Sequence, residues 1–294
     1  MKIRAHESFY IRKGWLQKGV KNVSNDAKVF ANDNVCDILG IGSNMVKALR
    51  YWLNATKVIE ERQYKNGKNA IVTNVGKLIE KYDKYYEELG TLQVIHYLLS
   101  SNEEDATAWY WFFNIYSGTI VDKKMFVDEL SHFLTVEYSQ SSSQKVLEDE
   151  FNCLINTYNS KSMVEDDPEE TKICPLSELK LVELVDSKSK EYKKVAAKSE
   201  DIHPMIAYAI ISKAFETKDS DEMLINDICD SKCNLGKTFN LDRISIISLL
   251  NKLVNWGYIS MSRTAGLDII RVVRKMSFLE CLESYYKMLN GEEK

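Results

Sequence analysis

A chain of 294 residues accommodates about two or three domains. With 45% hydrophobic and 28% charged residues, its composition excludes a disordered protein. The net charge of −4 is unevenly spread: residues 1–79 hold 14 Lys and Arg against 6 Asp and Glu, and residues 80–294 hold 25 against 37. This asymmetry indicates either a surface for nucleic-acid phosphates in the first part or a basic face that docks on the acidic remainder.

Local patterns predict a cytoplasmic, mainly α protein. No run of about 18 apolar residues and no secretory signal pattern occurs, so we expect no membrane contact. Only three Pro occur and long stretches have helical periodicity. We expect winged helix-turn-helix domains at the N- and C-terminal ends around a helical middle domain, with boundaries at 1–88, 89–198 and 199–294.

The first module begins with a helix whose apolar side is formed by Trp15, Leu16 and Val20. A short helix then stops at Gly40, and Ser43 is expected to cap a second helix that reaches about Thr56. Its predicted buried stripe comprises Val46, Leu49 and Leu53. The opposite face carries side chains suited to phosphates and base edges, namely Ser43, Asn44, Lys47, Arg50, Tyr51 and Asn54.

A basic hairpin follows this helix. Two extended segments flank Asn66-Gly67, which is the strongest short-range hairpin signal, and Thr73 is expected to cap the next helix. The cations near the tip are Arg62, Lys65 and Lys68. The order of helix, glycine turn, helix, hairpin and helix is typical of a winged helix, so the module predicts contact with double-stranded DNA. Winged helices used only for protein contact remain the alternative.

The middle of the chain predicts consecutive helices over 92–99, 106–116, 124–134 and 146–158. One of them contains five neighbouring aromatic residues, 109–113. Because such a run points in every direction around a helix, we expect a packing core rather than a base-stacking surface.

A second module is predicted near the C-terminus, with helices over 205–215 and 222–229. Asp242 is expected to cap a further helix, and two extended runs over 258–262 and 267–273 follow it. The apolar stripe of that helix is predicted as Ile244, Ile247, Leu250 and Val254. A second possible nucleic-acid or partner face comprises Arg243, Lys252, Arg263, Arg271 and Arg274. The pattern favours DNA contact and protein contact equally here.

No motif of catalysis or cofactor binding is found: GxxxxGK, GxGxxG and HExxH are all missing from the sequence. We therefore expect no enzyme, no catalytic residues and no cofactor. Cys229 and Cys233 are spaced like one helical turn rather than a zinc knuckle, so we expect free thiols and no metal.

Short segments along the chain carry a family resemblance: His6 to Phe9, Gly14 to Lys18, Leu39 to Val46, Arg50 to Trp52 and Trp109 to Asn114. In this order and spacing they resemble the uncharacterised prokaryotic family domain of unknown function 4007, over nearly the whole chain. The resemblance implies an accessory protein encoded near genes for DNA sulfur modification, or phosphorothioation, in an antiviral setting. It implies a relative of phosphoadenosine phosphosulfate reductase, or another DNA-modification protein, as partner, and it supplies no catalytic residues that could be carried over to this chain.

We expect a DNA-binding accessory protein of a DNA-modification or defence system. Two alternatives remain open: a protein-protein adaptor for a modification enzyme that never contacts DNA, and a transcriptional regulator.

Overall fold

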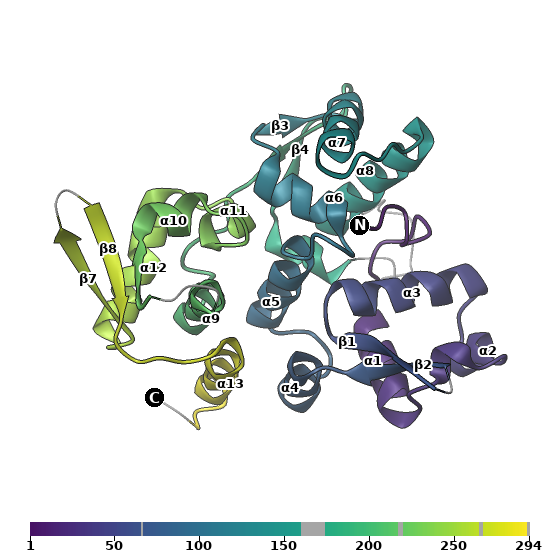
Figure 1. Ribbon diagram of the computed structural model, residues 1–294, viewed down its shortest axis with the longest axis horizontal. Coiled ribbons are helices and arrows are strands. Elements are labelled where there is room, and N and C mark those ends of the chain that lie inside the picture. The colour runs from purple at the N-terminus through teal and green to yellow at the C-terminus, as the bar shows by residue number, and fades with distance from the viewer. Residues whose placement is uncertain (66, 160–173, 217–219, 265–266, 293–294) are drawn as a thin grey trace. The chain divides into compact units, whose positions relative to one another are not determined.

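The computed structural model describes residues 1–65, 67–159, 174–216, 220–264 and 267–292 (Figure 1). Helices account for 54% of the chain and strands for 13%, so helix predominates as predicted and small sheets accompany it. The chain divides into two compact units, Met1–Phe112 with Tyr116–Val195, and Phe113–Ile115 with Ala196–Lys294. The three-domain division remains a prediction. None of the described helices is long and apolar enough to cross a lipid bilayer.

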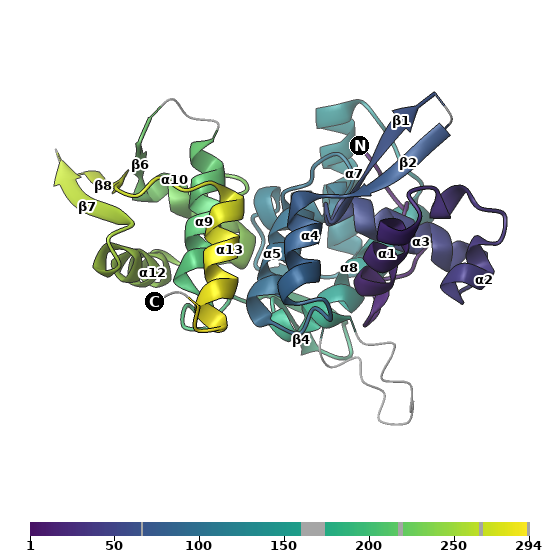
Figure 2. The same cartoon turned by 90° about the horizontal axis from the view of Figure 1, so that it is seen from below.

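The first part of the first unit contains the elements predicted for it: α1 (Trp15–Asn25), α2 (Val35–Leu39), α3 (Ser43–Ala55), β1 (Ile59–Tyr64), β2 (Gly67–Val72) and α4 (Asn74–Tyr82), with a 3-10 turn at Val29–Ala31. The strands pair antiparallel from Ile59 opposite Val72 to Tyr64 opposite Gly67. Figure 2 shows this hairpin extending away from α4. Asn66 lies outside the described residues, and Gly67 has a φ of 108°. The predicted hairpin is therefore confirmed.

Helix α4 starts against the base of the hairpin. Thr73 caps it as predicted, because its hydroxyl accepts a hydrogen bond from the amide of Gly76 at 3.1 Å. A Cβ atom on Gly76 would lie 2.2 Å from the carbonyl oxygen of Val58, so a glycine is required at this close approach. The cap predicted for α3 is wrong by one residue, because Gly42 is the cap and Ser43 is the first helical residue.

The N-terminal segment, residues 1–12, covers a second side of α3. The indole of Trp52 donates to the carbonyl oxygen of Phe9 at 2.8 Å. His6 is fully buried, and its Nε2 lies 3.2 Å from Oε1 of Glu150 on α8 (Gln144–Tyr158). Arg4 forms an ion pair of 2.9 Å with Asp149 on the same helix. The segment thus joins α3 to α8.

The rest of the first unit is built mainly from α5 (Leu89–Ser100), α6 (Thr107–Tyr110), α7 (Lys123–Tyr138) and α8. The π-helical turn Trp111–Ile115 starts in this unit, and its residues Phe113–Ile115 belong to the second. These elements confirm the predicted helices, and every residue of the aromatic run 109–113 is at most 5% exposed. The run is therefore packing core, as predicted. A three-stranded sheet of order β3-β5-β4 was not predicted; its strands are β3 (Ile120–Val121), β4 (Val182–Asp186) and β5 (Glu191–Lys194).

The second unit contains α9 (Pro204–Phe215), β6 (Glu222–Leu224), α10 (Ile225–Asp230), α11 (Leu235–Phe239), α12 (Arg243–Asn255), β7 (Ile259–Thr264), β8 (Leu267–Val272) and α13 (Phe278–Leu289). Its sheet has the order β6-β8-β7, and α9 packs along α13 (Figures 1 and 2). Residues 222–224, predicted as the start of a helix, form a strand instead, and the helix begins at Ile225.

The apolar stripe predicted for α12 is confirmed only at Leu250. Ile244 is 80% exposed, Ile247 and Val254 are half-buried, and the other buried residues are Ile246, Leu249 and Leu253. Asp242 caps the helix as predicted, accepting from the amide of Ser245 at 2.8 Å. Ile244 lies in the first turn after this cap and faces solvent. The buried stripe therefore starts at Ile246.

Candidate nucleic-acid interface

A surface groove with a volume of about 540 Å³, hereafter the basic groove, lies along α3 and the hairpin. Its cations are Lys2, Lys47, Arg50, Lys57 and Lys68, and its carboxylates are Glu60, Glu61 and Asp105. The cations come from the N-terminal segment, α3, the turn after α3 and β2, whereas β1 contributes Glu60 and Glu61. A concave surface of this charge attracts phosphates.

Helix α3 buries the apolar stripe that its periodicity predicts, and the start of its predicted polar face is exposed. Val46, Leu49 and Leu53 are buried, whereas Asn44 and Lys47 are exposed. The ammonium group of Lys47 contacts only the amide oxygen of Asn44, at 3.5 Å, among the described residues. Lys47 is therefore accessible to a phosphate.

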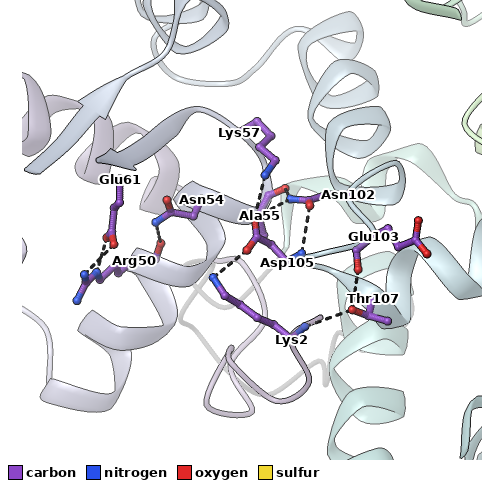
Figure 3. Close-up of polar contacts among 10 residues, drawn as sticks. All are labelled: Lys2, Arg50, Asn54, Ala55, Lys57, Glu61, Asn102, Glu103, Asp105 and Thr107. Atoms are coloured by element: carbon purple, nitrogen blue, oxygen red, sulfur yellow. Dashed lines mark hydrogen bonds and ion pairs between the residues drawn. The ribbon is translucent and has the colours of Figure 1, made fainter. Parts of the chain in front are cut away.

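Arg50 joins the helix to the hairpin. Its Nη2 donates to Oε2 of Glu61 on β1 at 2.8 Å, and its Nε donates to the other carboxylate oxygen (Figure 3). This hydrogen bonding to Glu61 raises the pKa of Arg50. Partial burial opposes ionisation of Glu61, but the guanidinium outweighs it and lowers the pKa of that carboxyl. Arg50 thus stands in the groove with its charge already paired.

A second ion pair network closes one end of the groove. The ammonium groups of Lys2 and Lys57 each lie 2.8 Å from an oxygen of Asp105, and Asn102 fixes the turn by donating to the carbonyl oxygen of Ala55 at 2.9 Å (Figure 3). Partial burial opposes ionisation of Asp105, but the two lysines hold its pKa at about 2. Sequence reasoning missed Lys2 and Lys57, because only the fold brings these positions together.

The prediction that Tyr51 faces solvent is wrong. Its side chain is 8% exposed, and its ring centroid lies 6.0 Å from that of His6 and 4.9 Å from that of Trp52. Burial raises the pKa of Tyr51 well above its ordinary value. The N-terminal segment covers this side of α3, and periodicity along the helix alone carries no information about that contact.

The hairpin supplies the remaining predicted cations. Arg62 forms an exposed ion pair with Glu60 at 2.5 Å, and Lys68 lines the groove. Lys65 and Lys68 are exposed and form no ion pair with any described residue. Together with Ser43 and Asn44 at the start of α3, they lie on the predicted face of the first module.

Most cations of the second predicted face are held by partners in their own unit. Arg243 bridges Asn226 and Asp268, with 2.6 Å to the latter, and Arg271 donates to Glu222 at 2.9 Å. Arg274 lies over the ring of Tyr258 at 5.2 Å, Lys252 is half-buried, and the side chain of Arg263 lies outside the described part. Burial lowers the pKa of His203 to about 4, and the charge of Lys252 adds to this effect.

No group of three or more His, Cys, Asp or Glu that could hold a metal occurs in the part of the chain that the structure describes. Cys229 lies on α10, but Cys233 follows that helix with a φ of 57°. The interpretation that both thiols share one helix face is therefore wrong.

One family model and two solved structures match nearly the whole chain. A family model described as Protein of unknown function (DUF4007) matches residues 3–286. A solved structure described as magnesium ion-bound SspB matches with a TM-score of 0.87 and 21% identity, over 99% of this chain and 88% of that one. Another SspB crystal structure matches with a TM-score of 0.86 and 20% identity over the same shares. At such identities the likeness shows the fold. None of the curated proteins matches.

Proposed function

The chain belongs to the family described as Protein of unknown function (DUF4007), and from this membership and the basic groove we propose a DNA-binding accessory protein of a prokaryotic DNA-modification or antiviral defence system. The observation that carries the proposal is the groove itself, in which cations from four separate segments line one concave surface. The predicted link to DNA sulfur modification is part of this proposal.

The order α1, α2, α3, β1, β2 and α4 fits a winged helix-turn-helix. In such domains the helix before the wing enters the major groove and the wing reaches the neighbouring backbone. We assign the first role to α3, with Asn44 and Lys47 toward DNA, and the second to the hairpin, with Lys65 and Lys68 toward phosphates. Arg50 and Lys57 line the groove between them.

The second unit fits a different role. Its order α9, β6, α10, α11, α12, β7 and β8 also suits a winged helix. However, Arg243 and Arg271 are paired with carboxylates, and Ile244 is 80% exposed where a DNA-reading helix would meet bases. A hydrophobic side chain beside neutralised cations suits protein contact better than phosphate contact. This unit is our candidate face for a DNA-modification protein partner.

A salt series of duplex binding tests the proposal. The full chain is titrated onto a fluorescent duplex of arbitrary sequence at several salt concentrations, and log K is plotted against log salt. The proposal expects a linear decrease, at about 0.9 per phosphate contacted. No binding, together with a stable complex with a modification protein, would favour the adaptor, and binding to one promoter alone would favour the regulator.

The same titration tests the expected absence of catalysis. One matched structure is described as magnesium-bound, so each binding sample is prepared with Mg²⁺ and with a chelator, and the DNA strands are then separated on a denaturing gel. The proposal expects intact strands in both samples. If the unaltered chain cleaved DNA strands in the presence of Mg²⁺ and a purified groove variant did not, the protein would be an enzyme instead.

A further inference from the structure

Arg50 and Glu61 hold each other across the basic groove. The contact is bidentate, and it joins α3 to β1 (Figure 3). The side chain of Arg50 is 39% exposed and that of Glu61 is 17% exposed, so solvent reaches the guanidinium while the carboxylate is more enclosed. A ligand in the groove can therefore approach Arg50 directly.

A carboxylate and a phosphate can bind the same edge of a guanidinium. Both accept two parallel N–H donors with the same fork geometry. Because the Nε and Nη2 donors of Arg50 are engaged by Glu61, a phosphate gains this edge only if Glu61 leaves it. Until then, the negative charge of Glu61 also opposes a phosphate in the groove.

We propose that Glu61 limits the affinity of the basic groove for nucleic acid by competing with a backbone phosphate for Arg50. The inference rests on the proposed DNA binding and identifies the residue that tunes it. When DNA is bound, Arg50 exchanges Glu61 for phosphate, and one more counterion is released from the DNA.

The other acidic residues of the groove are placed differently. Asp105 accepts from Lys2 and Lys57 at 2.8 Å and from Asn102 at 3.3 Å, so it holds the wall of the groove together. Glu60 pairs with Arg62 on the exposed side of the same strand, where the two side chains are 43% and 60% exposed. Water and salt readily replace such an exposed pair. Glu183 on β4 forms a similar exposed pair with Lys193 at 3.3 Å, and neither residue lines the basic groove, so Glu183 is the matched control for Glu61.

The test compares Glu61→Gln, Glu183→Gln and the double variant Arg50→Ala/Glu61→Gln with the unaltered full chain in the duplex salt series. Both single variants remove one negative charge that is paired with a cation. For Glu61→Gln, one added phosphate contact steepens the salt slope by about 0.9. If the gain vanishes at about 1 M salt, this corresponds to about 15-fold tighter binding at 50 mM and about fourfold at 200 mM.

Three results support the inference together: a steeper slope for Glu61→Gln, an unchanged slope for Glu183→Gln, and loss of the gain in the double variant. Equal gains for both single variants would show that only net charge matters, and a gain that persists without Arg50 would show that the guanidinium is not the contested group. Either outcome overturns the inference while leaving DNA binding intact. Absence of salt-dependent binding in every folded protein of the set overturns both proposals.

Discussion

Replacing Lys47, Lys65 and Lys68 together by Ala should weaken duplex binding without disturbing the fold. All three side chains are exposed, and none forms an ion pair with a described residue. Exposed substitutions of this kind change stability by less than about 0.5 kcal/mol each, so the melting temperature should scarcely move. Arg50 is not replaced, because its removal would leave the half-buried carboxylate of Glu61 without its ion-pair partner.

The expected loss of affinity follows from the number of phosphates released. If each lysine contacts one phosphate, the salt slope should fall by about 2.7, at about 0.9 per contact. Extrapolated from about 1 M salt, this makes binding weaker by about 10²-fold near physiological salt. Fluorescence anisotropy with a labelled duplex, repeated over a salt series, measures both quantities.

A matched control separates the effect of losing the groove lysines from the effect of removing positive charge. Lys123, Lys124 and Lys145 are exposed on α7 and α8 and do not line the basic groove. Their replacement by Ala changes the net charge by the same amount as the groove variant. Because these lysines lie outside the groove, most of the salt slope should remain. If the groove variant is folded and keeps the unaltered slope, or if both triple variants lose it equally, then the surface of α3 and the hairpin is not the DNA site.

Three further outcomes are expected. Tyr51→Phe should leave duplex affinity unchanged, and Tyr51→Ala should lower the free energy of unfolding by about 3–5 kcal/mol in urea titrations, because the ring is core; weaker DNA binding by folded Tyr51→Phe would contradict its assignment to the core. The Asp105 carboxylate, with its pKa lowered to about 2, stabilises the fold above its ordinary value near 3.8, and this contribution is lost as the pH falls toward 2. Asp105→Asn should abolish that acid-dependent increment, about 1 kcal/mol after solvent screening, and an unchanged pH profile would refute it. Elemental analysis should find no zinc, and one equivalent would contradict the expectation that Cys229 and Cys233 bind no metal.

Local signals along the sequence predicted the first module well. Helix periodicity, the glycine after α2, the hairpin signal and the cap at Thr73 each act within a few residues, and each was found where predicted. The phase of α12 was wrong because an exposed Ile244 at a helix start looks, by residue type, like the beginning of a buried stripe.

The candidate site was predicted only in part, because its remaining members depend on long-range contacts. Lys2 and Lys57 reach the groove through Asp105, which lies 48 residues beyond Lys57 in sequence. Tyr51 is buried by the N-terminal segment, and the pairing of Arg50 with Glu61 depends on the register of the hairpin relative to α3. None of these contacts can be predicted from the periodicity of the sequence.

The N-terminal segment limits how far the first module, residues 1–88, can be treated as a separate part. His6 contacts Glu150 on α8, and the same segment covers Tyr51 and Trp52 on α3. A fragment ending near residue 88 would leave His6 without its buried carboxylate neighbour and expose the aromatic side of α3. Residues 1–88 fused alone to another protein should therefore fold poorly. A fusion that is to reproduce the groove would have to include α8 as well.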